Sequence, residues 1–247
     1  MRSLGVLCAR GTSKRLPRKH LRPLLGIPLV SWMCRAAAAS DLTRVIMSTE
    51  DDEIAAEAAK SVDVPFKRSA HLAEDFVEDF DIVVDALDRA EKEEGKKYDI
   101  VVMLQPTTPF TLPADINGCL ERMAADDTLA CCFTARPVTE PPQWMFVNKD
   151  NGRVLPILED INASNAAAHK QLLPQCWFPS GAAYAVRAEA LRAQKRIYAT
   201  PYAIQPMPRE RSIDIDEEAD LILAEAVGRV QKFAPIPITP HDRRNGR

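Results

Sequence analysis

The sequence predicts an α/β protein with a mostly parallel sheet that helices cover on both faces. Short, fully apolar runs alternate with longer amphipathic segments from the first residues to about residue 135. Apolar runs of this kind are typical of parallel strands, because both faces of such a sheet are buried. The alternation favours strand–helix–strand units over separate helical and β domains.

The expected elements follow this pattern in order. Strands are expected at residues 4–8, 45–48, 64–67, 100–104, 129–134 and 182–186. Helices are expected at residues 28–39, 51–60, 77–94, 113–125 and 217–230. Pro28 suits a first helical turn, and Asp51 and Asp52 favour a helix N-terminus. Since ligands bind beyond the carboxyl ends of parallel strands, the loops that follow the strands are candidate sites.

The pattern breaks after residue 135. Residues 136–179 are rich in proline and contain two aromatic patches, QWMFV and QCWFP, and the pair Asn151-Gly152 predicts a hairpin turn. We expect a core formed by residues 1–135 and 180–233, with residues 136–179 inserted as an arm. The polar, proline-rich residues 234–247 are expected to be disordered.

Composition and charge restrict the functional classes. The formal net charge of -3 over 247 residues argues against a general nucleic-acid binder. The six cysteines form no C-x-x-C pair, and the four histidines show no zinc spacing. No apolar run reaches membrane length, and the chain enters a strand without a secretory segment. We therefore expect a cytoplasmic protein with no nucleic-acid and no membrane partner.

The segment ARGTSKRLPRKH, residues 9–20, concentrates five cations directly after the first strand. It lacks both the Walker A pattern and G-x-G-x-x-G. Backbone N–H groups, hydroxyls and cations together suit a triphosphate, although a solvated basic turn would have the same composition. The groups concerned are those of Gly11, Ser13, Arg10, Lys14 and Lys19.

The segment SIDIDEEADL, residues 212–221, carries two carboxylates at alternate positions. In an extended chain Asp214 and Asp216 face one way and the intervening isoleucine faces the other. Such a pair can hold Mg²⁺ beside phosphates, and Asp216 can alternatively cap the following helix. A third segment, LQPTTPF at residues 104–110, presents an amide and hydroxyls on a proline-stiffened loop, or is simply a rigid turn.

Together these motifs resemble the acylneuraminate cytidylyltransferases, also called CMP-sialic acid synthetases. ARGTSKRLPRKHLRPLLGIPL is similar to that family's opening motif, LQPTTPF to its L-Q-P-T-S-P, SIDIDEEADL to its S-I-D-I-D, and FPSGAAYAVR to its P-N-G-A-x-Y. The matches occur in order from residue 5 to about residue 225. The resemblance implies a Rossmann-like nucleotidyltransferase fold in which residues 136–179 form a dimerisation arm. It also implies a homodimer that uses Mg²⁺ to transfer CMP from CTP to an acidic acceptor, a nine-carbon 2-keto acid sugar, and releases pyrophosphate.

The resemblance further implies roles for individual residues. Arg10, Lys19 and Asp214 would be catalytic, and Asp214 and Asp216 would bind the metal. The nucleotide site would comprise Arg10, Gly11, Ser13, Lys14, Lys19, Arg68 and Asp79. The acceptor site would comprise Gln105, Lys170, Phe178 and Ser180, with Lys170 on the arm where the family has an arginine.

The sequence also departs from the family's pattern. His20 replaces the asparagine that follows the family's lysine, and Asp79 replaces a serine that helps to read cytosine. Thr111 and Phe178 replace arginines, and Ser180 replaces the asparagine of P-N-G. We therefore expect an acceptor other than N-acetylneuraminate, namely another nonulosonic acid such as legionaminate or pseudaminate, or a phosphonate.

A nucleotide-binding dimer without transferase activity is the alternative from another class. The retained Lys19 and the retained pair of aspartates argue against it, because a simple binder has less use for a metal and a leaving-group clamp.

Overall fold

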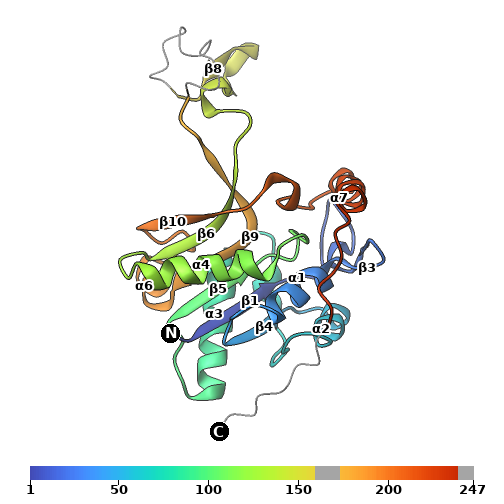
Figure 1. Cartoon of the computed structure of the whole chain (residues 1–247), viewed down its shortest axis with the longest axis vertical. Coiled ribbons are helices and arrows are strands. Elements are labelled where there is room, and N and C mark those ends of the chain that lie inside the picture. Colours follow the sequence, from blue (N-terminus) through green and yellow to red (C-terminus); the bar gives the residue numbers. More distant parts are fainter. Residues whose placement is uncertain (159–172, 239–247) are drawn as a thin grey trace.

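A six-stranded sheet lies at the centre of the computed structural model, which describes residues 1–158 and 173–238 (Figure 1). The strand order is β10-β6-β9-β5-β1-β4, and β9 is antiparallel to both of its neighbours while the other pairs are parallel. This confirms the mostly parallel sheet. The strands are β1 (Ser3–Cys8), β4 (Arg44–Ser48), β5 (Ile100–Leu104), β6 (Cys131–Pro137), β9 (Trp177–Arg187) and β10 (Tyr202–Pro206).

Helices cover both faces of this sheet. Side chains of α1, α2 and α4 share one apolar cluster with the sheet, and those of α3 and α6 share a second cluster on the other face. Asp51 caps α2 by accepting from the backbone N–H groups of Glu53 and Ile54, and Gly95 ends α3 in the left-handed region. The helices are α1 (Leu29–Ala38), α2 (Asp52–Ala58), α3 (Asp79–Glu94), α4 (Pro113–Ala125), α6 (Ala188–Gln194) and α7 (Glu218–Gln231).

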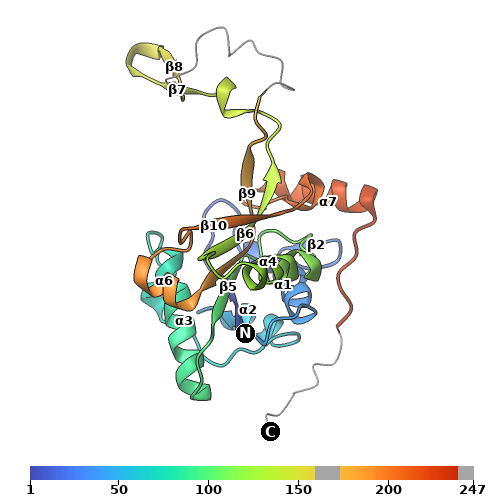
Figure 2. The same ribbon diagram turned by 60° about the vertical axis from the view of Figure 1, so that its left-hand side comes forward.

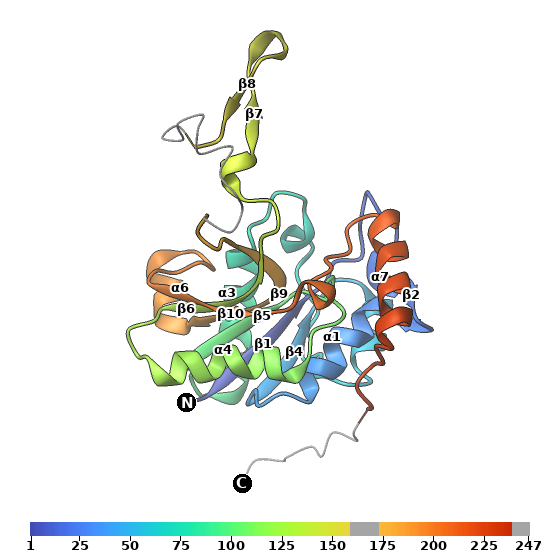
Figure 3. The same cartoon turned by 45° about the horizontal axis from the view of Figure 1, so that its top comes forward.

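A third apolar cluster lies beside the sheet and joins segments that are distant in sequence. It contains Leu16 from the basic segment, Ile215 from between the two aspartates, and residues of α1 and α7. Trp32 and Phe110 pack edge to face in it at 5.4 Å between ring centroids. Figure 3 shows α7 beside the short strand β2 (Pro23–Leu24), which pairs with β3 (Ile27–Pro28). This cluster fixes the basic segment relative to the carboxylate segment.

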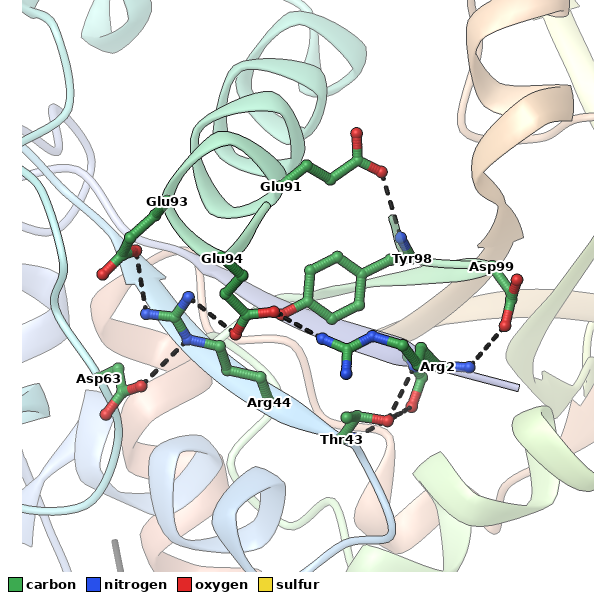
Figure 4. Close-up of polar contacts among 10 residues, drawn as sticks. Arg2, Thr43, Arg44, Asp63, Glu91, Glu93, Glu94, Tyr98 and Asp99 are labelled. Atoms are coloured by element: carbon green, nitrogen blue, oxygen red, sulfur yellow. Dashed lines mark hydrogen bonds and ion pairs between the residues drawn. The ribbon is translucent and has the colours of Figure 1, made fainter. Parts of the chain in front are cut away.

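A network of ion pairs lies at the amino-terminal edge of the sheet, where β1, β4 and β5 begin (Figure 4). Arg44 pairs with Asp63, Glu93 and Glu94, while Glu94 also accepts from Arg2 and from the Tyr98 hydroxyl. The network ties the end of α3 to the start of the sheet. The network lies at the opposite end of these strands from the candidate site.

The arm projects away from the core in Figures 1 and 2. Within it β7 (Phe146–Asn148) and β8 (Val154–Pro156) form an antiparallel hairpin, and Asn151 and Gly152 have φ values of 62° and 73°. The predicted hairpin turn is confirmed. Residues 159–172 of the predicted arm and residues 239–247 of the predicted tail lie outside the described residues.

Two details differ from the sequence prediction. No strand forms at residues 64–67, and the one isolated bridge nearby, between Ile46 and Asp63, lies just before this range. Pro65 has no N–H with which to continue a ladder. The helix α6 and the edge strand β10 were not predicted, because residues 188–206 are short segments of mixed polarity. Within the described residues, no helix combines the length and the hydrophobicity needed to cross a bilayer.

Candidate functional site

A cavity of about 370 Å³ opens at the carboxyl ends of β1 and β5. Its volume falls within the range of small-molecule sites, about 300–1,000 Å³. Three of the predicted motifs meet in it. The lining residues are Cys8, Arg10, Lys19, His20, Arg68, Leu72, Glu74, Asp75, Val77, Asp79, Ile82, Gln105, Pro106, Thr107, Asp214 and Asp216.

A buried ion pair braces the start of the basic segment. The backbone N–H of Gly11 donates to Glu50 Oε1 at 2.7 Å, and Arg68 donates from Nη2 to Glu50 Oε2 at 2.6 Å and to the Ala9 carbonyl at 2.9 Å. A Cβ at Gly11 would collide with the carboxylate of Asp51, so the close approach requires glycine. Arg68 therefore holds the loop as well as lining the cavity. Sequence reasoning missed Glu50.

All five cations of the basic segment form ion pairs with carboxylates. Arg10 and Lys14 both donate to Asp75, and Arg18 pairs with Asp51 and Glu53. Lys19 and Arg15 both donate to Asp216, at 2.9 and 2.6 Å. An anionic ligand at this loop would compete with Asp75 and Asp216 for the same donors. Asp75 was also missed, since its place beside the loop depends on tertiary structure.

The two aspartates have different environments. Burial raises the pKa of Asp216, but the hydrogen bond and charge of Lys19, followed by those of Arg15, outweigh it and lower the pKa. The side chain of Asp214 is exposed, but neighbouring protein atoms desolvate it in part and raise its pKa; a hydrogen bond from Thr107 opposes this shift and the charge of Asp216 reinforces it. No cation among the described residues forms an ion pair with Asp214. Asp214 is thus the carboxylate that a bound cation would stabilise more.

The alternation within this segment is confirmed. Ile215 is fully buried between the two carboxylates, and its backbone N–H donates to the Thr107 carbonyl at 2.9 Å. The alternative role of Asp216 as a helix cap is wrong, because Glu217 is the N-cap residue of α7. The carboxylate of Asp220 accepts from the backbone N–H groups of Asp216 and Glu217.

Gly181 brings Gln105 next to Asp214. It has a φ of 80°, and a Cβ there would lie 3.3 Å from Asp214 Oδ2 and 3.4 Å from Gln105 Oε1. Three oxygen atoms therefore surround this glycine: Gln105 Oε1 and Thr108 Oγ1 from the loop that follows β5, and Asp214 Oδ2 from the segment before α7. Carboxylate and amide oxygens are the ligand types that Mg²⁺ prefers. Asp214 and Asp216 supply oxygen donors of this type, and magnesium binding at this pair stays a prediction.

His20 and Asp79 lie in the same cavity. His20 is 6% exposed, and burial, followed by the charges of Lys19, Arg68 and Arg10, lowers its pKa to about 3. Its buried Nδ1 has no hydrogen-bond partner among the described residues. Burial raises the pKa of Asp79.

Other predicted residues do not line the cavity. Gly11, Ser13 and Lys14 belong to the loop but not to the lining. Ser180 is buried and donates to Thr134 Oγ1 at 2.7 Å, while Phe178 is 56% exposed beside Arg136. Their roles toward an acceptor stay predictions. Lys170 lies outside the described residues.

Comparison with known proteins gives the family. Residues 4–150 match the family model described as cytidylyltransferase. The chain is 30% identical over 243 residues to a CMP-N,N'-diacetyllegionaminic acid synthase of Legionella pneumophila, covering 95% of this chain and 99% of that protein. It is 28% identical to a pseudaminic acid cytidylyltransferase of Campylobacter jejuni, covering 93% and 97%.

A solved structure supports the fold. The structure of a CMP:2-keto-3-deoxy-manno-octonic acid synthetase complexed with CTP superposes with a TM-score of 0.69 at 18% identity, covering 94% of this chain and all of that one. The family assignment rests on the matched family model and relatives, and the sheet and the cavity at its carboxyl edge agree with it. The chain is a nucleotidyltransferase and belongs to the cytidylyltransferase family.

Proposed function

We propose that this protein transfers CMP from CTP to the anomeric hydroxyl of a nonulosonic, sialic-acid-like 2-keto sugar and releases pyrophosphate. The observation that carries the proposal is the convergence of Arg10 and Lys19 with Asp214 and Asp216 in one cavity. A triphosphate needs the cations, and a metal beside it needs the carboxylates. The relatives named for pseudaminic and diacetyllegionaminic acids favour an acidic sugar over a phosphonate as the acceptor.

The reaction would be an in-line displacement at the α-phosphorus. The acceptor oxygen forms a bond to the α-phosphorus while the bond to the bridging oxygen breaks, and the electron pair leaves with pyrophosphate. Positioning and electrostatic stabilisation supply most of the rate in such transfers. Lys19 and Arg10 would bind the triphosphate and stabilise the charge that develops on pyrophosphate.

The proton of the acceptor hydroxyl needs a base. Asp216 is held by Lys19 and Arg15, whereas Asp214 accepts from Thr107, has no ion pair within the described residues and lies beside Gln105. Asp214 is therefore the better candidate to accept the proton, and Gln105 to orient the acceptor.

Mg²⁺ would be held by Asp214 and Asp216. When bound, it would neutralise phosphate charge and help to fix the triphosphate in place. Lys19 and Arg15, which both pair with Asp216, would share this carboxylate with the metal and would be free to donate to phosphate oxygens instead.

Pyrophosphate release tests this function. Each of the four nucleoside triphosphates is incubated with Mg²⁺ and pseudaminic acid, N,N'-diacetyllegionaminic acid, 2-keto-3-deoxy-manno-octonic acid, N-acetylneuraminate or 2-aminoethylphosphonate. We expect release with CTP and at least one nonulosonic acid. Release with the phosphonate alone, or with no acceptor, would contradict the proposal.

A further inference from the structure

Asp115 is a buried carboxylate that the proposed reaction does not use. It is the third residue of α4, its side chain is 5% exposed, and it does not line the cavity. Its Oδ2 accepts from the backbone N–H of Leu112 at 2.8 Å. A carboxylate in the first turn of a helix stabilises that helix, so one role of Asp115 is to cap α4. Its second partner indicates a further role.

The second partner is Arg211, which directly precedes the carboxylate segment of residues 212–221. Its guanidinium donates from Nη2 to Asp115 Oδ1 at 2.9 Å and from Nη1 to Oδ2, so both oxygens of the carboxylate are held. Bidentate pairs of this kind fix the relative orientation of the two groups. Arg211 is 15% exposed and ends the short turn η6 (Arg209–Arg211), three residues before Asp214. The ion pair therefore ties the start of the carboxylate segment to α4.

The loop between β5 and α4 lies against the same guanidinium. Arg211 Nη1 lies 3.5 Å from the Phe110 carbonyl oxygen. Thr111, which replaces an arginine of the family's pattern, donates from its hydroxyl to the Thr108 carbonyl at 2.8 Å. It is therefore Arg211, from a different segment, that brings a guanidinium to this loop.

A second attachment to this loop lies on the other side of Asp214. The backbone N–H of Ile215 donates to the Thr107 carbonyl at 2.9 Å. The Ile215 side chain is fully buried and belongs to the same apolar cluster as Phe110. Asp214 thus lies in a short stretch of chain that is fixed at both ends.

The fixed stretch places Asp214 beside Gln105. Asp214 Oδ2 and Gln105 Oε1 lie 3.3 and 3.4 Å from the position that a Cβ would take at Gly181. Rates of group transfer depend strongly on such distances, since a displacement of about 1 Å can lower the rate about 100-fold. Loss of either attachment would let Asp214 move relative to Gln105.

We propose that Arg211 and Asp115 are positioning residues, whose ion pair holds Asp214 beside Gln105 during CMP transfer. The inference rests on the proposed function and adds to it two residues that do not line the cavity. A purely structural role would give a different result. If the pair only stabilised the fold, turnover would return whenever stability returned.

The double variant Arg211→Met, Asp115→Asn separates the two roles. Each single variant leaves one buried charge without its partner, which is strongly destabilising, whereas the double variant removes both charges. The asparagine oxygen still accepts from the backbone N–H of Leu112. We expect each single variant to lower the melting temperature by about 10 °C, and the double variant to recover at least about half of that loss.

Turnover should not recover with stability. It is measured with CTP and the acceptor identified by pyrophosphate release, at a temperature below every melting transition. We expect kcat to fall about 10- to 100-fold in both single variants and in the double variant, with less than about a 3-fold change in the KM for CTP. Arg211→Lys keeps the charge but loses the paired hydrogen bonds, so it should retain more of the wild-type kcat.

Glu91→Gln is the matched control. The Glu91 side chain is 4% exposed, and it too accepts from a backbone N–H, that of Tyr98, and from an arginine, Arg192. It lies on α3 and outside the cavity. Glu91→Gln should lower the melting temperature and leave kcat unchanged.

A stable double variant with the wild-type kcat overturns the inference, and so does a rise in KM with kcat unchanged. An equal loss of kcat in Glu91→Gln overturns it as well, because the loss of any buried ion pair would then slow the reaction. If the single variants do not fold, the double variant and Arg211→Lys decide. A wild type that releases no pyrophosphate with any acceptor would instead refute the proposed function, and the inference with it.

Discussion

Among the five cations of the basic segment, Lys19 has the least exposed side chain. Its side chain is 12% exposed, against 81% for Lys14 at the rim, and its ammonium lies 2.9 Å from Asp216. A charge held in a partly dry site stabilises a developing anion more than the same charge in water. Under the proposed function, we therefore expect Lys19 to stabilise the departing pyrophosphate.

Lys19→Ala should lower kcat by about 100-fold or more, with a smaller change in the KM for CTP. A contact that strengthens in the transition state appears in kcat, whereas uniform binding appears in KM. Steady-state kinetics at saturating acceptor measure both. Lys67→Ala, which removes an exposed lysine paired with Asp52, is the control. An effect confined to KM would reduce Lys19 to a docking residue.

His20 gives the protein a specific sensitivity to acid. Its pKa falls from about 6.5 to about 3 on folding. Below pH 6.5 the unfolded chain binds a proton that the folded chain does not, so stability is complete above pH 6.5 and decreases as the pH falls toward 3. Between pH 7.5 and 5, this group should remove about 2 kcal/mol from the free energy of unfolding.

His20→Gln should abolish that part of the pH dependence. Urea titrations at the two pH values measure it, as the difference between the wild type and the variant. His71→Gln, which changes an exposed histidine on η2, should behave as the wild type does. Equal losses of stability in wild type and His20→Gln would show that His20 is not held neutral.

Among the secondary-structure elements, we propose that β9 aligns the side chains that would hold the acceptor. Gly181 adopts a φ of 80° where β9 passes Gln105 and Asp214. An alanine there would be strained, and its Cβ would crowd both side chains at 3.3–3.4 Å. Gly95, at the end of α3, has a similar φ of 65° but open space around it.

Gly181→Ala and Gly95→Ala should therefore separate strain from function. Each should lower the free energy of unfolding by about 1–2 kcal/mol. Only Gly181→Ala should also lower kcat, by about 10- to 100-fold, because it displaces Gln105 and Asp214. Thermal unfolding and turnover of the two variants are compared. Equal turnover would mean that β9 does not align these side chains.

A comparison of the predicted and observed elements shows how much of the fold the sequence predicts. Short apolar runs predicted five of the six strands of the sheet, because a strand that is buried on both faces is almost entirely apolar. The strand predicted at residues 64–67 does not form, because Pro65 lacks an N–H group. The edge strand β10 was not predicted, because its sequence mixes polar and apolar residues without a clear pattern. Lys19, Asp214 and Gln105 were predicted because each lies within a recognisable motif, and all three line the cavity. Glu50 and Asp75 were not, because their function depends on loops that meet only after folding.

Considering the whole molecule, the described part of the arm, residues 136–158 and 173–179, leaves most of its large apolar side chains exposed and has no core of its own. An isolated two-stranded hairpin is marginal in water, and an apolar patch of this kind usually marks an interface. We propose that the arm joins two chains in a twofold homodimer, as the family resemblance implies. Its exposed apolar residues are Trp144, Met145, Phe146, Val147, Val154, Leu155, Ile157, Leu158, Trp177 and Phe178.

Light scattering at micromolar concentration should give twice the mass of the 27.4 kDa chain. The double variant Phe146→Glu, Leu155→Glu should shift it toward the monomer, since it places charges on the hairpin. Ile222→Glu, on the exposed face of α7, should leave the dimer intact. A wild-type mass near that of one chain would refute the dimer.

The proposed function requires that CMP transfer take place in the cavity at the carboxyl edge of the sheet, with Asp214 taking part. The most direct test is the single-turnover formation of the CMP-linked product by Asp214→Asn and by the wild type. CTP and the acceptor identified by pyrophosphate release are both saturating, and Mg²⁺ is varied. Asp52→Asn, at the exposed start of α2, is the control. We predict that Asp214→Asn binds CTP and unfolds at the wild-type temperature but reacts at least about 100-fold more slowly. A rate close to that of the wild type at limiting Mg²⁺ would contradict the account.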